Sequence, residues 1–162
     1  MAEVVLIPND RRPILIGKNG SIKKRIEKLT NTKITVREDV EIEGDIFDVA
    51  KAKDIITAIA RGFSPERAFI LLNENFELKI ITLKGQTDKT IKRLMARVIG
   101  RKGSTRRIIE LETGAKISIY GKTVSIIGEL KKLEAAQEAV EAILAGRKHG
   151  TAYKRMLRKV KD

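Results

Sequence analysis

The sequence predicts an α+β fold that consists of two copies of one small domain in tandem, each with the element order β-α-α-β-β-α. Three observations support this prediction. The chain matches itself at a fixed offset, and strand-like and helix-like hydrophobic patterns follow the same order in both halves. The length of 162 residues, with 42% hydrophobic residues, also suits two small packed domains.

The internal repeat has an offset of 83 residues and is strongest around two glycine pairs. Residues 16–21 (IGKNGS) align with residues 99–104 (IGRKGS), and nine of the 21 positions from residue 16 to residue 36 are identical without a gap. A repeat of this length is too long for a solenoid unit and fits a domain of about 70–80 residues.

Each copy is expected to open with a strand. Residues 3–8 are rich in β-branched side chains, and residues 76–83 alternate apolar with polar ones. In the second copy, a helix that begins near Thr87 and Asp88 follows the strand and runs into Gly100. Its apolar residues recur every three or four positions and form one stripe: Ile91, Leu94, Met95, Val98 and Ile99.

A second helix and two strands follow the glycine pair in each copy. Their expected ranges are 20–30, 33–37 and about 41–47 in the first copy, and 103–113, 116–120 and 123–127 in the second. Tyr120-Gly121-Lys122 is short enough for a tight turn, so the two strands of the second copy should pair as a hairpin.

Each copy is expected to close with a helix, because apolar residues again follow the helical period. These residues are Val49, Ala52, Ile56 and Ile59 in the first copy and Leu130, Leu133, Val140 and Ile143 in the second. Between the copies, Ser64, Pro65 and Glu66 supply an N-cap, a proline at the first helical position and an acid in the first turn. They predict a short connecting helix over residues 65–72.

A basic helix is expected at the end of the chain. Tyr153, Met156, Leu157 and Val160 form an apolar stripe that should pack on the body of the protein, while the basic residues around it face RNA. We predict a first domain (1–63), a linker (64–75), a second domain (76–148) and a basic helix (149–162). Because the linker is short, the two domains should pack together.

Positive charge is concentrated in the second half of the chain. The sequence has 34 Lys and Arg against 21 Asp and Glu, a net charge of +13. Residues 1–75 contain 13 basic and 12 acidic residues (+1), whereas residues 76–162 contain 21 and 9 (+12). Such an excess is typical of proteins that bind polyanions, nucleic acid above all, and it favours the second copy as the main contact.

Several classes of function are excluded by composition. With no Cys and one His, the chain lacks the residues for disulfide scaffolds, thiolate metal sites and imidazole-clustered zinc sites. It has no apolar run near the roughly 18 residues that span a bilayer and no basic leader at its start, so we expect a cytoplasmic protein without membrane contact. We also expect no cofactor, no bound metal and no enzymatic activity.

One acidic cluster is the only candidate for metal-dependent nuclease chemistry: Glu38, Asp39, Glu41, Glu43, Asp45 and Asp48. Glu41, Glu43 and Asp45 alternate along a predicted strand, which is typical of a solvated sheet face. We therefore interpret the cluster as a surface that repels RNA and attracts basic protein partners.

A glycine pair between two helices, with basic residues between the glycines, forms a cradle for sugar-phosphate. The arrangement resembles the eukaryotic-type (type I) KH domain of RNA-binding proteins, in which the GXXG loop clamps about four nucleotides against the second strand. The resemblance implies that bases lie on an aliphatic floor formed by Ile16, Ile34, Ile99, Ile117 and Ile119, and that nearby cations contact phosphates.

The second copy supplies the main candidate RNA-binding residues: Ile99, Gly100, Arg101, Lys102, Gly103, Ser104, Arg106, Arg107, Lys116, Ile117 and Ile119. The first copy supplies a secondary set: Ile16, Gly17, Lys18, Asn19, Gly20, Ser21 and Lys24.

With GKNG, then GRKG, a connecting helix and a basic tail, nearly the whole chain resembles the archaeal branch of the ribosome-assembly family that includes the eukaryotic factor Partner of Nob One, also called Dim-two. The resemblance implies a non-catalytic factor that binds single-stranded RNA in the 3′ region of small-subunit (16S) ribosomal RNA, beside an endonuclease and a dimethyltransferase. Two alternatives use the same clamp: a regulator of messenger RNA or translation, and an RNA-binding subunit of a processing enzyme.

The first glycine loop departs from the pattern of this family. Eukaryotic members have a degenerate first module without an intact loop, whereas this chain keeps GKNG. The resemblance therefore leaves open whether the first module binds RNA or only retains the loop. The nearly neutral first half favours a weaker role in RNA binding than that of the second module.

Overall fold

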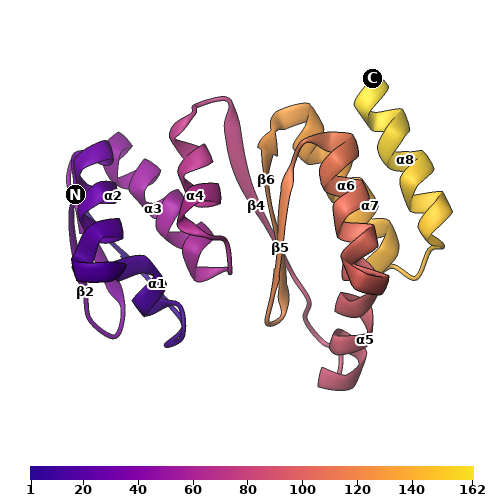
Figure 1. Ribbon diagram of the computed structural model, residues 1–162, viewed down its shortest axis with the longest axis horizontal. Helices are drawn as coiled ribbons and strands as arrows, with labels where there is room; N and C mark the ends of the chain where they lie inside the picture. The colour runs from indigo at the N-terminus through magenta and orange to yellow at the C-terminus, as the bar shows by residue number, and fades with distance from the viewer. The chain divides into compact units, whose positions relative to one another are not determined.

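The computed structural model describes residues 1–162 and divides them into two compact units, Met1–Glu74 and Asn75–Asp162. Each unit has a three-stranded antiparallel sheet and a set of helices (Figure 1). No helix in either unit combines the length and the apolar character that crossing a bilayer requires.

The first unit has the predicted order of elements. Its sheet has the strand order β1-β3-β2. The elements, with 3-10 helices labelled η, are β1 (Ala2–Val5), α1 (Arg12–Ile16), η1 (Lys18–Gly20), α2 (Ser21–Thr30), β2 (Lys33–Val36), β3 (Val40–Glu43), α3 (Ile46–Ala60), α4 (Pro65–Ala68) and η2 (Phe69–Leu72).

The second unit repeats the order β-α-α-β-β-α, and the helix α8 follows where the first unit has α4 and η2. Its sheet has the corresponding strand order β4-β6-β5. Its elements are β4 (Phe76–Thr82), α5 (Asp88–Ile99), η3 (Arg101–Gly103), α6 (Ser104–Thr113), β5 (Lys116–Tyr120), β6 (Thr123–Glu129), α7 (Leu130–Leu144) and α8 (His149–Lys161). The predicted α+β class and the hairpin between β5 and β6 are therefore confirmed.

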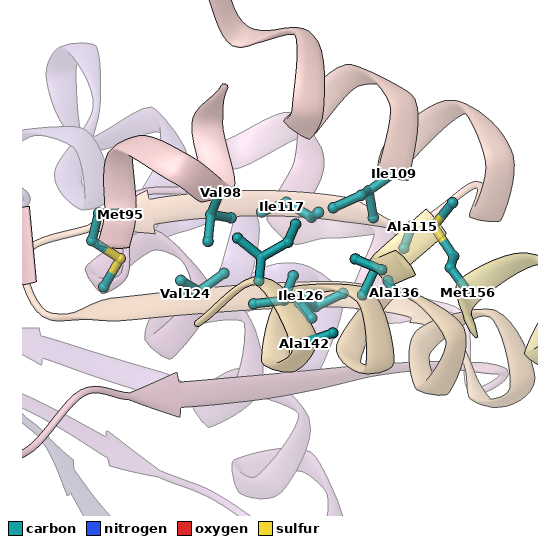
Figure 2. Close-up of a cluster of buried hydrophobic side chains, with 14 of the residues drawn as sticks. Met95, Val98, Ile109, Ala115, Ile117, Val124, Ile126, Ala136, Ala142 and Met156 are labelled. Atoms are coloured by element: carbon teal, nitrogen blue, oxygen red, sulfur yellow. The ribbon is translucent and has the colours of Figure 1, made fainter. Parts of the chain in front are cut away.

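The core of the second unit lies between its sheet and its helices. Alternate residues of β5 and β6 face the helices, and Ile117, Val124 and Ile126 are each at most 1% exposed. Figure 2 shows these side chains meeting Val98 of α5 and Ile109 of α6. Burial of each such side chain contributes about 1.5–3 kcal/mol, so the cluster fixes the place of both helices that flank the glycine loop.

The C-terminal helix α8 is part of the second unit and packs on α7. Met156 is fully buried in the shared core (Figure 2). Tyr153 and Val160 pack against that core, as the apolar stripe predicts. The exception is Leu157, which is 40% exposed, while Ala152 is buried. Ala152 therefore takes the place of Leu157 in the buried stripe, and the other three predicted residues are as expected.

The strand predicted at residues 41–47 is wrong at its end. β3 stops at Glu43, and Asp45 is the extended N-cap residue of α3, whose carbonyl accepts a hydrogen bond from Val49 N at 2.8 Å. Because the chain is helical from Ile46 onward, residues 44–47 do not continue the strand. The opening strand is also shorter than predicted, because β1 has only the four residues Val40–Glu43 to pair with.

The connecting segment is helical, as predicted, and packs on α3 within the first unit. Ser64 caps it, since its Oγ accepts a hydrogen bond from Arg67 N at 3.3 Å. The predicted domain boundaries and the packing of the two units against each other stay predictions.

An arginine closes the last turn of the long helix in each unit. Arg97 donates to the carbonyl oxygen of Ile143 (2.6 Å), in the last turn of α7, and to that of Arg147 (2.7 Å), just beyond the helix. Arg11 does the same for α3, donating to Ile59 O at 2.8 Å and to Phe63 O at 2.7 Å. These bonds bring a charged donor to carbonyls at and just beyond the end of each long helix, and they join the segment before each glycine loop to that helix.

Candidate nucleic-acid interface

The two glycine loops have the same backbone conformation. The first glycine has φ 72° and ψ 175° in Gly17 and φ 77° and ψ 172° in Gly100. The residue before the second glycine, Asn19 or Lys102, is left-handed at φ 58° or 55°. Two turns with such uncommon dihedral angles in the same order show that the repeat extends to the backbone of the loop.

The first glycine of each loop is required by a close approach of the next helix. A Cβ atom on Gly100 would lie 2.6 Å from the backbone nitrogen of Thr105 and nearer still to its Oγ1. A Cβ atom on Gly17 would lie 2.5 Å from Ile22 Cγ1. No larger residue fits here without moving the first turn of the helix.

The second glycine of each loop is required by backbone conformation alone. Gly20 and Gly103 have φ near +73° and +75°, yet the nearest atom to an added Cβ on Gly103 lies 3.6 Å away, on Arg107. Space is available, and the cost of a larger residue comes from the left-handed dihedral angle.

The loop of the second unit presents cations beside a helix N-terminus that no side chain caps. Arg101 and Lys102 are exposed in the loop, and the first turn of α6 follows directly, with Arg107 exposed and Arg106 half-buried. Because the N–H groups and dipole of a helix N-terminus attract anions, phosphate is the ligand that this surface fits.

A carboxylate ties the second helix to the edge strand in both units. Glu110 Oε2 accepts a hydrogen bond from Ile117 N at 2.8 Å, and Glu27 Oε2 accepts one from Ile34 N at 2.8 Å. β5 and β2 are edge strands, so this bond fixes the distance between helix and strand. The sequence prediction missed both glutamates, although they are identical in the repeat.

The structure corrects the predicted floor of isoleucines. Ile34 and Ile117 are 2% and 1% exposed and belong to the two cores, so their side chains are not available to a base. Ile16 and Ile119 are half-buried, and Ile99 is 38% exposed. Only these three side chains reach the surface.

An apolar groove on α6 adds two residues that the sequence prediction missed. Leu111 is 82% exposed and Ile108 is 37% exposed. Both line a groove of about 640 Å³ whose lining residues are Ser104, Arg107, Ile108, Glu110, Leu111 and Lys116. The predicted residues Ser104, Arg107 and Lys116 thus lie together at one groove. The sequence signal for the missed pair was an apolar residue at two outward positions of an otherwise polar helix face.

No group of three or more His, Cys, Asp and Glu side chains in the chain is arranged to hold a metal ion. In the acidic cluster, Glu41 and Glu43 do alternate on one face of β3, but Asp45 lies in the cap of α3 and not on that face. The predicted three-residue row on the sheet is therefore wrong for Asp45.

Comparison with known families gives two matches. Residues 75–161 match the family described as eukaryotic type KH-domain (KH-domain type I), and residues 2–58 match the KH domain. The crystal structure of Dim2p from Pyrococcus horikoshii covers 98% of this chain and 99% of its own, with 49% sequence identity and a TM-score of 0.90. The chain belongs to the Dim2 family of KH-domain proteins.

Further relatives are similar over most of the chain. The structure of an a/eIF2alpha-aDim2p-rRNA complex from P. horikoshii matches 100% of this chain and 95% of that chain, with 48% identity and a TM-score of 0.92. KH domain-containing protein MJ0443 of Methanocaldococcus jannaschii is 44% identical over 94% of this chain and 71% of its own length. Pre-rRNA-processing protein pno1 of Aspergillus fumigatus is 28% identical over 82% of this chain, which spans about half (52%) of that relative.

The different roles of the two glycines predict unequal effects of the same substitution in this Dim2-family chain. Gly100→Ala should destabilise the second unit by at least about 4 kcal/mol, because its Cβ clashes with backbone. Gly103→Ala should cost only about 1–2 kcal/mol, the penalty of a left-handed residue. Urea unfolding followed by circular dichroism measures both. Equal losses of stability would contradict the close contact between Gly100 and Thr105.

Proposed function

We propose that this chain is a non-catalytic RNA-binding factor in assembly of the small ribosomal subunit. The observation that carries the proposal is the second unit's glycine loop, which places an anion-binding helix terminus beside an apolar groove and an edge strand. Two relatives support the context: one is named for pre-rRNA processing, and one was crystallised with rRNA.

In this proposal, different residues contact the phosphates and the bases of the RNA. Arg101, Lys102 and the first turn of α6 hold the sugar-phosphate backbone, with Arg106 and Arg107 at adjacent phosphates. Unstacked bases lie over the exposed aliphatic side chains Ile99, Ile108 and Leu111, and the edge of β5 offers backbone groups to base edges. Bases in a duplex are stacked and paired, so this groove selects single strands.

The proposed RNA is the 3′ region of 16S rRNA or its precursor, bound in the cytoplasm. We also propose protein partners in the maturing subunit, among them an endonuclease and a dimethyltransferase. The P. horikoshii relative was crystallised with a/eIF2alpha as well as rRNA, which supports binding of protein and RNA together.

The identity of the RNA is tested by crosslinking in cells. Sequencing of RNA crosslinked to the chain should map the contacts to the 3′ region of small-subunit rRNA. Contacts spread over messenger RNAs would instead make the chain a regulator of translation, the alternative that uses the same clamp.

The groove model predicts a preference for single-stranded RNA. A short strand of about eight nucleotides should bind better than a hairpin stem of the same sequence, because only the strand offers unstacked bases. If about four phosphates are neutralised, a plot of log K against log salt concentration should have a slope of about −3. Titrations by fluorescence anisotropy measure both properties. Equal affinity for stem and strand would refute the groove model.

Equal edits in the two loops should have unequal effects on binding of the short strand. Arg101→Asp with Lys102→Asp should weaken binding by about 2–4 kcal/mol, through lost charge-assisted hydrogen bonds and added repulsion. Lys18→Asp with Asn19→Asp should cost about 1 kcal/mol or less, because this change removes only one cation and the first half of the chain is nearly neutral. All four positions are exposed, so melting should not change. Equal losses of affinity would show that the GRKG loop is not the primary site.

A further inference from the structure

One edge of the first unit's sheet has no neighbouring strand. β1 lies at the edge of the strand order β1-β3-β2. The Met1 and Gly44 nitrogens each donate to the carbonyl of the other residue, at 3.0 and 3.1 Å, so these two residues form a hydrogen-bonded pair. Along an antiparallel ladder such pairs alternate with non-bonded pairs. Val4 therefore directs its N–H and C=O groups away from β3, toward the free edge.

The side chains on this edge are apolar and exposed. Val4 is 58% exposed and Leu6 is 75% exposed, whereas Val5 and Ile7 are each 7% exposed. This period of two shows that the extended chain continues past the end of β1. Natural sheet edges commonly carry charged residues, lysine above all, that prevent pairing with another chain. The exposed side of this edge carries none, so it is open to an added strand.

A groove of about 670 Å³ follows the same edge and is lined by residues of the strand and of α3. Its helix side includes Lys53, Thr57 and Arg61, which are four residues apart and so lie along one side of the helix. Lys53 Nζ pairs with Glu3 Oε2 at 3.5 Å, which joins the helix to the strand. An edge strand beside a groove is the arrangement in which an extended peptide adds a strand and places alternate side chains in the groove.

The outer face of the sheet adds negative charge to this edge. Glu41 lies opposite Val4 in the ladder between β1 and β3. A hollow of about 390 Å³ at this face shares Val4 and Asp39 with the groove. Three acids and one cation line the hollow: Glu38, Asp39, Glu41 and Arg37. None of the three carboxylates has an ion-pair partner, so they are available to a cation of another molecule.

We propose that this edge binds an extended, basic segment of a partner protein as an added strand. We call the surface the β1 edge site and define it by Val4, Leu6, Asp39, Glu41 and Thr57. RNA takes no part in this contact, which therefore goes beyond the proposed function.

The two sides of the β1 edge site select different side chains of the segment. Alternate side chains of an added strand point to opposite sides of the sheet. On the α3 side, Lys53 and Arg61 repel cations and favour apolar side chains. On the outer side, the aliphatic stem of a lysine or arginine covers Val4 while its charged head reaches Glu41. The segment therefore alternates basic with apolar residues.

Neither RNA nor a second copy of the chain fits the β1 edge site as well. Phosphate is repelled by the hollow, whose lining has a net charge of −2. A second copy would offer its own residues 1–6, in which Glu3 is the only charged side chain and the terminal amine is already bonded to Gly44 O. The glycine loop and α2 adjoin the opposite edge, β2, where Ile34 N donates to Glu27, so a segment at β1 leaves them free.

A synthetic probe tests the β1 edge site in the full chain. The probe is a blocked peptide of about ten residues in which lysine alternates with valine, titrated into isotope-labelled protein. Binding should shift the amide signals of residues 2–7, 38–41 and 53–61 and leave those of the second unit unchanged. A peptide with glutamate in place of lysine should bind at least about tenfold more weakly, because the hollow is acidic.

Backbone pairing is tested by N-methylation of the probe. One peptide carries methyl groups on its lysine nitrogens and a second carries them on its valine nitrogens, so each loses the N–H donors of one edge of its strand. Only one of these edges faces β1. One peptide should therefore bind at least about tenfold more weakly than the parent peptide, and the other within about twofold of it. The weakened peptide shows whether the added strand is antiparallel or parallel.

Variants of the chain test the edge and the charge separately. Val4→Pro removes an outward N–H that β3 does not use, so peptide binding should fall at least about tenfold while melting changes little, and Val4→Ala, which keeps this N–H, should bind within a few-fold of the wild type. Glu41→Lys should weaken binding about tenfold, whereas Glu66→Lys, an equal change of charge at an exposed position of α4, should not. Affinity for the short RNA strand should not fall in any variant.

Three results would overturn the inference. Absence of peptide binding, or equal effects of the two methylated peptides, would exclude an added strand. Dimerisation of the free chain in sedimentation, lost in Val4→Pro, would assign the edge to a second copy. Failure of the wild-type chain to bind the short RNA strand would instead refute the proposed function and leave the β1 edge site standing, so the two failures are distinguishable.

Discussion

The contact between the first glycine of each loop and the turn of helix that follows it is the constraint on which both units depend. Thr105 lies against Gly100, and Ile22 lies against Gly17, at distances that leave no room for a side chain. This contact sets the direction in which α6 or α2 leaves the loop. The helix then reaches the edge strand, where Glu110 or Glu27 fixes it through a strand N–H. The cradle and the groove therefore share one rigid frame.

The two units differ in the side chains that they carry on this shared backbone frame. The net charge of the two halves, +1 and +12, suggests a strong and a weak version of one site. Much of the positive charge of the second unit lies outside the glycine loop and α6. Nine of its cations are on α5 and α8: Lys89, Lys92, Arg93, Arg97, Lys154, Arg155, Arg158, Lys159 and Lys161. The units differ more sharply in kind, because Ile108 and Leu111 form an exposed apolar surface at positions where the first unit has Arg25 and Lys28.

The C-terminal helix and the arginine caps join the frame to the rest of the second unit. Arg97 holds the end of α7 with its side chain, while its own carbonyl accepts a hydrogen bond from His149 Nε2 at 2.9 Å. α8 therefore touches the helix that precedes the glycine loop as well as α6, where Tyr153 OH lies 3.4 Å from Thr105 Oγ1. Arg11 caps α3 from a position that the 83-residue offset does not align with Arg97, so the two units reached the same cap from different residues.

The sequence by itself determined the repeat, the order of elements, both glycine loops and the α+β class, because each of these follows from local patterns of glycine, charge and apolar spacing. Only the tertiary structure decided which isoleucines reach the surface. Ile99 and Ile117 look alike in sequence, yet the helices bury one face of the sheet, so Ile117 is core and Ile99 is surface. The same holds for Glu110, whose partner is seven residues away on a strand, and for Asp45, where helix capping replaced the strand pattern. Burial depends on contacts between distant segments, and a local hydrogen bond depends on where each helix and strand ends. The spacing of residue types alone contains neither.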